Sequence, residues 1–189
     1  MQITPGDPAI DDTNFWIFGY ASLMWRPGFQ YIEACAATLP GYVRDMCFLS
    51  IHYRGTPEVP GLVCGLMPVN GSACLGRAYR IAPDDIAAAV DYLDARELIT
   101  NIYVPRHLVI KLEHGRNVTA RIYVSDTAHA QFVGGWTDVA KAAAIARGVG
   151  SEGRSLDYLT SLVEHLRSFG IKDARIENLL EKAEALAAA

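Results

Sequence analysis

No apolar run in this sequence is long enough to cross a membrane, although 51% of its 189 residues are hydrophobic. A membrane-spanning helix needs about 20 consecutive apolar residues. The first 13 residues hold prolines and acidic residues, but they have neither the basic region nor the apolar region of a secretory signal. We therefore expect no membrane partner, a cytoplasmic location, and a flexible N-terminal segment over residues 1–13.

An excess of positive charge is also missing. The chain has 17 Lys and Arg against 21 Asp and Glu, which gives a net charge of −4. The basic residues are scattered rather than massed, whereas nucleic-acid binding needs a basic patch. This pattern argues against a nucleic-acid partner and leaves a small molecule as the expected ligand.

Metal-binding patterns are absent as well. No pair of cysteines forms Cys-x-x-Cys, and no pair of the 5 histidines forms His-x-x-x-His or a His-Glu zinc motif. We therefore expect no metal ion and no cofactor. Buried thiols are common in reduced compartments, so the four cysteines are interpreted as small core residues: Cys35, Cys47, Cys64 and Cys74.

What is present is enough apolar sequence for one domain, which we predict over residues 14–189. Aromatic and β-branched runs predict strands early in the chain, and apolar stripes predict helices late. The expected strands are 15–18, 36–39, 44–50, 62–66, 76–81, 103–112 and 119–124; the expected helices are 83–97, 136–147, 155–169 and 173–187. Strands in one block with helices at the end indicate an α+β fold.

The most informative segment runs from Phe15 to Gly28, where an apolar aromatic run stops abruptly in small and polar residues. It is typical of a buried strand that feeds a tight turn. Backbone N–H groups in such a turn can bind an anion. The same local pattern is also typical of an ordinary turn, so both interpretations stay open on these residues alone.

A carboxylate continues the apolar stripe of the helix that begins at Pro83. Ile86, Val90 and Leu93 share one face, and the next step of four reaches Glu97. Burial would raise the pKa of this carboxyl and suit it to proton transfer near neutral pH. The alternative is a glutamate solvated at the helix end.

Several blocks in the same order resemble the ChaC-type γ-glutamylcyclotransferases, over residues 15 to 180. The first is Phe-Gly-Tyr-Ala-Ser-Leu at residues 18–23, which is similar to the family's Phe-Gly-Tyr-Gly-Ser-Leu. The others are His-Tyr-Arg-Gly-Thr-Pro at 52–57, Gly-Arg-Ala-Tyr-Arg at 76–80, Tyr-Leu-Asp-Ala-Arg-Glu at 92–97, Tyr-Val-Pro at 103–105, and Gly-Ser-Glu-Gly-Arg at 150–154. The resemblance implies a mixed, mainly antiparallel, β-barrel-like sheet with flanking helices and a helical C-terminal third.

The resemblance also implies the chemistry. In the family's reaction, the α-amine of a γ-glutamyl group attacks its own γ-carbonyl, which releases 5-oxoproline and, from glutathione, Cys-Gly. The family's general acid/base glutamate lies in this Arg-Glu context, so the resemblance assigns that role to Glu97. The residues expected to bind substrate are Ile17, Phe18, Gly19, Tyr20, Ala21, Ser22, Leu23, Arg54, Tyr103 and Tyr123.

Some of these assignments have structural alternatives. Tyr103 and Tyr123 match tyrosines of the family, but half-buried strand tyrosines would give the same pattern. Arg54 could bind a glutathione carboxylate bidentately, or it could be a solvated loop residue. Ala21 stands where the family has glycine, and its methyl group would strain a left-handed backbone.

Three other functions remain open at this point. The chain could act on another γ-glutamyl amine, or it could bind a small molecule without catalysis. A serine hydrolase based on Ser22 is the third, although the residues around it do not form Gly-x-Ser-x-Gly.

Overall fold

The computed structural model describes residue 8 and residues 13–188. These residues form two compact units: the first holds residues up to 44 together with 66–126, and the second holds 45–65 together with 127 onward. The N-terminal segment 1–13, expected to be flexible, lies almost wholly outside the described residues. The single domain expected over 14–189 stays a prediction.

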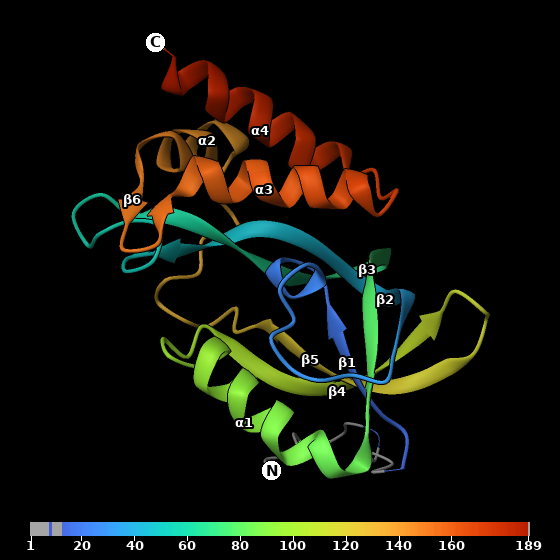
Figure 1. Cartoon of the computed structure of the whole chain (residues 1–189). Coiled ribbons are helices and arrows are strands. Elements are labelled where there is room, and N and C mark those ends of the chain that lie inside the picture. The colour runs from blue at the N-terminus through green and yellow to red at the C-terminus, as the bar shows by residue number, and fades with distance from the viewer. Residues whose placement is uncertain (1–7, 9–12, 189) are drawn as a thin grey trace. The chain divides into compact units, whose positions relative to one another are not determined.

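Five strands close into a barrel in the order β1-β3-β2-β4-β5 (Figure 1). The strands are β1 (Phe15–Gly19), β2 (Glu33–Ser50), β3 (Gly61–Ile81), β4 (Tyr103–Leu112) and β5 (Asn117–Ser125). β1 pairs antiparallel with β3 and parallel with β5, and β4 pairs antiparallel with both β2 and β5. The predicted α+β fold with a mixed, mainly antiparallel barrel is therefore confirmed.

Two of these strands are longer than the sequence predicted. The expected strands 36–39 and 44–50 are one strand, β2, and the expected strands 62–66 and 76–81 are one strand, β3. Gly41 and Gly71 interrupt the apolar pattern, yet both lie inside a strand with φ of 78° and 77°. A glycine in the left-handed conformation bends a strand without ending it.

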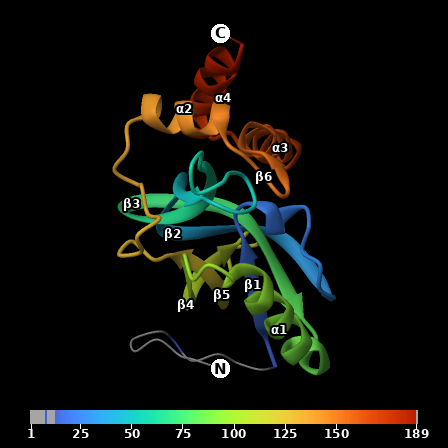
Figure 2. The ribbon, with the colours of Figure 1, turned by 90° about the vertical axis from the view of Figure 1, so that its left-hand side faces the viewer.

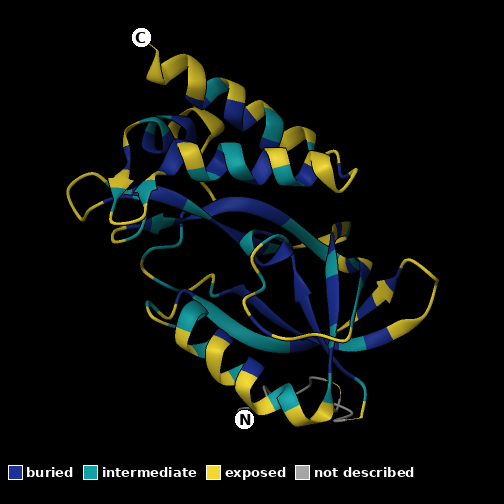
Figure 3. Ribbon diagram, in the orientation of Figure 1, coloured by how far each residue is buried: buried dark blue, intermediate teal, exposed yellow. Residues whose placement is uncertain are grey.

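Helix α1 (Ile86–Glu97) follows a 3-10 turn at Pro83–Asp85 and covers one side of the first unit's core. Ala89 and Leu93 are buried, and Ile86 and Val90 pack beside them. They join β-strand side chains in one hydrophobic cluster that includes Phe15, Ile17, Tyr79 and Tyr123. Figure 3 shows the resulting contrast between the exposed and the covered sides of α1.

The second unit contains three helices, α2 (Asp138–Arg147), α3 (Ser155–Ser168) and α4 (Ala174–Ala187), and a two-stranded sheet of β6 (Val149–Gly150) and β7 (Gly153–Arg154). The helices pack against one another in both ribbon views (Figures 1 and 2). α3 buries the apolar stripe expected from the sequence, Leu156, Leu159, Val163 and Leu166, together with Leu162.

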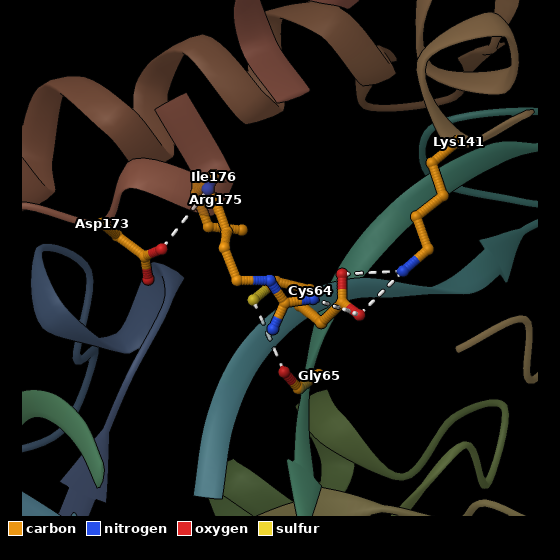
Figure 4. Close-up of polar contacts among 7 residues, drawn as sticks. Cys64, Gly65, Lys141, Asp173, Arg175 and Ile176 are labelled. Atoms are coloured by element: carbon orange, nitrogen blue, oxygen red, sulfur yellow. Dashed lines mark hydrogen bonds and ion pairs between the residues drawn. The ribbon is translucent and has the colours of Figure 1, made fainter. Parts of the chain in front are cut away.

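A buried ion pair lies within the second unit. Lys141 Nζ is 2.9 Å and 2.7 Å from the two carboxylate oxygens of Asp45, and both side chains are less than a tenth exposed. The exposed Arg175 adds a second cation at 3.6 Å from Asp45 Oδ2 (Figure 4). Breaking such a buried pair leaves an uncompensated charge and is strongly destabilising.

The four cysteines are buried, as expected for core residues. Within the described part of the chain, no helix combines the length and hydropathy of a membrane span.

Candidate active site

The β1 loop, residues 20–26, leaves the barrel at the end of a fully buried strand. A Cβ on Gly19 would lie 2.9 Å from Leu23 Cβ, so only glycine permits this close turn. The loop tightens into a 3-10 turn at Ser22–Met24, in which Met24 N–H donates to the Ala21 carbonyl at 2.8 Å. The first N–H groups of such a turn have no partner within it, which leaves those of Ser22 and Leu23 outside the turn's own bonding.

Buried side chains anchor the loop at its start. The Tyr20 hydroxyl donates to the Tyr123 carbonyl at 3.0 Å, and the Tyr20 carbonyl accepts from Arg44 Nε at 2.9 Å. Arg44 is only 3% exposed, and it also donates to the Leu75 carbonyl. Arg44 was not predicted as a site residue, because an arginine in a strand-like segment carries no sign of its distant carbonyl partners.

Tyr79 of β3 anchors the other half of the turn. Its hydroxyl lies 2.9 Å and 2.8 Å from the carbonyl oxygens of Leu23 and Met24. Burial raises the pKa of Tyr79 to about 12, so the phenol stays protonated and donates. Its block was part of the family resemblance, but no site role was predicted for it.

Ala21 does not have the positive φ that would need glycine. Its φ is −135°, outside the left-handed region. The methyl group therefore adds no strain of the positive-φ kind, and the loop accepts alanine at this position.

Glu97 is the last residue of α1, and its side chain is 17% exposed. Burial raises the pKa of this carboxyl, and the neighbouring Arg96 partly opposes the rise. Arg96 Nε lies 3.1 Å from Glu97 Oε1, and Arg96 Nη2 donates to Ser22 Oγ at 3.0 Å. The same arginine therefore contacts both the carboxyl and the β1 loop.

A second polar cluster surrounds Tyr123. Its hydroxyl donates to Asp94 Oδ1 at 2.6 Å and accepts from Arg121 Nε at 3.2 Å. Arg121 Nη2 also donates to both oxygens of Asp94, at 2.7 Å and 3.0 Å. Burial raises the pKa of Tyr123. Asp94 and Arg121 were not predicted, because their partners lie far apart in sequence.

The other predicted site residues of the first unit, Ile17, Phe18 and Tyr103, lie on strands β1 and β4. Ile17 and Phe18 are fully buried in β1. Tyr103 begins β4, is half-buried, and packs against the cluster that contains Ile17 and Tyr123. The first unit thus holds the β1 loop, Glu97 and both tyrosines in one contact network.

Arg54 belongs to the second unit. Its Nη1 donates to the Glu152 carbonyl, and its guanidinium lies over the Tyr158 ring, 5.4 Å from the centroid. A Cβ on Gly61 would lie 2.1 Å from the Arg54 carbonyl, so the backbone around Arg54 is closely packed. These contacts give Arg54 a role in holding its own loop, and carboxylate binding by Arg54 stays a prediction.

The described part of the chain holds no candidate metal centre. Among residue 8 and residues 13–188, no group of three or more His, Cys, Asp or Glu side chains could hold a metal ion.

The chain is thus a small α+β protein with a closed five-stranded barrel and a candidate acid/base site. In that site a partly buried carboxyl is joined through an arginine to the loop after the first strand. The chain belongs to the ChaC-like protein family, whose model matches residues 15–186. The resemblance inferred from the sequence blocks is confirmed by this match.

Named relatives cover most of the chain. The glutathione-specific γ-glutamylcyclotransferase of Escherichia coli K12 is 33% identical over 178 residues, which are 94% of this chain and 76% of the relative. The human glutathione-specific γ-glutamylcyclotransferase 1 is 28% identical over 162 residues, which are 85% of this chain and 73% of the relative.

A solved structure has the same fold. The crystal structure of a γ-glutamyl cyclotransferase specific to glutathione from yeast matches with a TM-score of 0.82 at 23% identity. The selenomethionine form of that structure covers 92% of this chain and 97% of its own. At this identity the likeness extends to the fold.

Proposed function

We propose that this protein is a glutathione-specific γ-glutamylcyclotransferase, a lyase that converts glutathione to 5-oxoproline and Cys-Gly. The names of its relatives support the substrate. The observation that carries the mechanism is the largely covered Glu97 carboxyl, 17% exposed and with a raised pKa, which is joined through Arg96 to the β1 loop.

The reaction requires no nucleophilic side chain from the protein, because the substrate supplies its own nucleophile. The α-nitrogen forms a bond to the γ-carbonyl carbon, and the amide C–N bond to the cysteinyl nitrogen breaks. Holding the γ-glutamyl group folded exploits intramolecular attack, for which effective molarities reach about 10⁵ M or more. The protein must supply proton transfer and stabilise the developing oxyanion.

Glu97 is the proposed acid/base. Its carboxylate takes a proton from the attacking nitrogen and returns it to the leaving nitrogen, a service typically worth about 10²- to 10⁴-fold. A raised pKa suits both halves of this cycle, because the group must accept a proton and release it near neutral pH.

The proposed substrate contacts come from the loop and the two tyrosines. The N–H groups of Ser22 and Leu23 would donate to substrate oxygens. The phenols of Tyr103 and Tyr123 would line the pocket, with Ile17, Phe18, Gly19, Tyr20 and Ala21 shaping its floor. We further propose that Arg54 binds a carboxylate of the substrate, that a small molecule rather than nucleic acid is the partner, and that the protein works in the cytoplasm.

A serine hydrolase is disfavoured by one contact. Ser22 Oγ accepts a hydrogen bond from Arg96 Nη2 at 3.0 Å. A guanidinium cannot take a proton from a serine hydroxyl, so this contact does not activate Ser22 as a nucleophile.

The test is product formation across a panel of substrates. Purified protein is incubated with glutathione and, separately, with γ-glutamyl amino acids, and 5-oxoproline is quantified by mass spectrometry. We expect product from glutathione, and its loss in Glu97→Gln but not in the matched Glu181→Gln, which changes an exposed glutamate of α4. Product only from other γ-glutamyl compounds would reassign the substrate, and no product from any would indicate a non-catalytic binding protein.

A further inference from the structure

We propose that Arg96 is a positioning residue, which holds the Glu97 carboxyl in its reactive place and ties it to the β1 loop. The inference rests on the proposed function, because it assigns Arg96 a part in the work of Glu97.

The guanidinium of Arg96 contacts three partners, two in the β1 loop and one at the end of α1. Nε pairs with Glu97 Oε1 at 3.1 Å, Nη2 donates to Ser22 Oγ at 3.0 Å, and Nη1 donates to the Arg26 carbonyl at 2.7 Å. The two ends of its planar fork therefore hold the β1 loop, while Nε holds the carboxyl.

The pairing of Arg96 with Glu97 is not a consequence of helix geometry. Consecutive residues of a helix point in different directions and do not face each other. These two meet because α1 ends at Glu97 and because the contacts with Ser22 and Arg26 draw the arginine toward the loop. The loop therefore orients Arg96, and Arg96 in turn orients Glu97.

A second side chain of α1, that of Tyr92, also fixes the β1 loop against the helix. Tyr92, one turn before Arg96, accepts from Arg96 Nη1 at 3.2 Å. A Cβ on Gly28 would lie 2.0 Å from the Tyr92 hydroxyl oxygen, so the ring rests directly on this glycine. Arg96 and Tyr92 together fix residues 22–28 against the end of α1.

Arg96 is also the cation set against Glu97, and the side chains of the pair are only 26% and 17% exposed. The carboxylate of Asp94, one turn earlier, is engaged by Arg121, and Arg26 contributes its main-chain carbonyl. On the barrel side the titratable groups of the neighbouring cluster are the phenols of Tyr79, Tyr103 and Tyr123. Arg96 therefore opposes the effect of burial on the pKa of Glu97.

An ion pair exposed on the surface would hold neither side chain in place, because such pairs commonly add almost nothing to the free energy of unfolding. A lysine at position 96 separates the two possible roles. It keeps the positive charge but replaces the planar fork, whose separated nitrogens reach Ser22, Arg26 and Glu97, by one compact ammonium group. Charge alone would be restored by Arg96→Lys, whereas positioning would not.

The experiment combines a carboxyl titration with steady-state kinetics. The side-chain carboxyl of Glu97 is followed by ¹³C NMR and assigned by its loss in Glu97→Gln, and kcat and KM for glutathione are measured in parallel. The variants are Arg96→Gln and Arg96→Lys, with Arg167→Gln as the control, since Arg167 forms an exposed ion pair in the second unit.

We expect Glu97 to bind its proton about tenfold more tightly in Arg96→Gln, in line with the loss of a neighbouring cation. The kcat should fall at least tenfold in both variants, while the titration of Arg96→Lys stays close to wild type. Wild-type kcat in Arg96→Lys would overturn the proposal, and so would an unchanged Glu97 titration in Arg96→Gln. If Arg96→Gln does not fold, Arg96→Lys decides the outcome by its kcat.

The NMR titration separates this proposal from the proposed function. If wild-type protein forms no 5-oxoproline, the proposed function fails, while an unchanged Glu97 titration in Arg96→Gln would defeat the positioning role by itself.

Discussion

At the scale of single residues, the partly buried Glu97 carboxyl is suited to proton transfer, but its ionisation lowers the free energy of unfolding. Its pKa is raised above the ordinary value of 4.5, chiefly by burial. The folded chain therefore binds this proton more tightly than the unfolded chain does. Stability should fall as pH rises from the unfolded-state pKa through the raised folded-state pKa, and it should then stay level.

The variant Glu97→Gln removes this ionisation. We expect it to be more stable than wild type at pH 7, because the glutamine carries no buried charge, and the difference should vanish below about pH 4. Thermal unfolding followed by circular dichroism at both pH values measures the effect. A wild type more stable than the variant at pH 7 would mean that Arg96 outweighs burial.

Ala21 gives a second prediction at this scale. Because its φ is −135°, restoring the family's glycine relieves no positive-φ strain. Ala21→Gly should instead lower the free energy of unfolding by about 0.4–1 kcal/mol through greater freedom of the unfolded chain. We expect its kcat to stay within twofold of wild type. A gain in both stability and kcat would contradict this view of the loop.

At the scale of elements, α3 is joined to β3 through its first residue. Ser155 Oγ accepts from Leu62 N–H at 2.9 Å and donates to the Leu62 carbonyl at 3.0 Å. Both residues are fully buried. Loss of this hydroxyl leaves a donor and an acceptor without a partner in the protein interior.

Ser155→Ala should therefore lower the free energy of unfolding by about 1–3 kcal/mol. Ser168→Ala is the matched control on the same helix, because Ser168 is exposed and bonds only locally to His165. The control should change the free energy by less than about 0.5 kcal/mol. Equal effects of the two substitutions in urea unfolding would remove the proposed role of Ser155.

Most helices and strands could be predicted from the sequence, and the exceptions have a local cause. Periodicity placed β1, β4 and all four helices close to their observed bounds. It split β2 and β3, because Gly41 and Gly71 look like turn residues when only local sequence is considered. Whether a glycine bends a strand or ends it depends on the neighbouring strands of the barrel, which no local pattern contains.

The sequence predicted the acid/base residue of the candidate site but not the arginines around it. The position of Glu97 followed from the stripe of α1 together with the family blocks. The arginines that organise the site, Arg44, Arg96 and Arg121, bond to groups 24 to 74 positions away. A sequence in isolation gives no period or spacing that links such partners.

At the scale of the whole molecule, the boundary between the two compact units falls inside β2 and β3. The division comes after Arg44 in β2 and after Gly65 in β3. Because two strands run through the boundary, we expect one cooperative unfolding transition rather than two.

The variant Lys141→Met, which destabilises the second unit, tests this expectation. It leaves Asp45 buried with only the exposed Arg175 nearby, so we expect the free energy of unfolding to fall by about 3 kcal/mol. Lys182→Met, which breaks an exposed pair with Asp138, should cost less than about 1 kcal/mol.

The readout uses tryptophan fluorescence in a Trp136→Phe background, where Trp16 and Trp25 report only on the first unit. The unfolding midpoint of these reporters should fall with that of the whole chain, as measured by circular dichroism. A midpoint unchanged in fluorescence but lowered in circular dichroism would show that the units unfold separately.

The most direct test of the account is the kcat of Glu97→Gln at saturating glutathione, with 5-oxoproline as the measured product. Glutamine keeps the shape and buried position of the side chain but cannot accept or return a proton. We predict that kcat falls by at least about 10²-fold while KM changes little, because proton transfer is lost and substrate binding is kept. A kcat within tenfold of wild type would contradict the assignment of Glu97 as the acid/base.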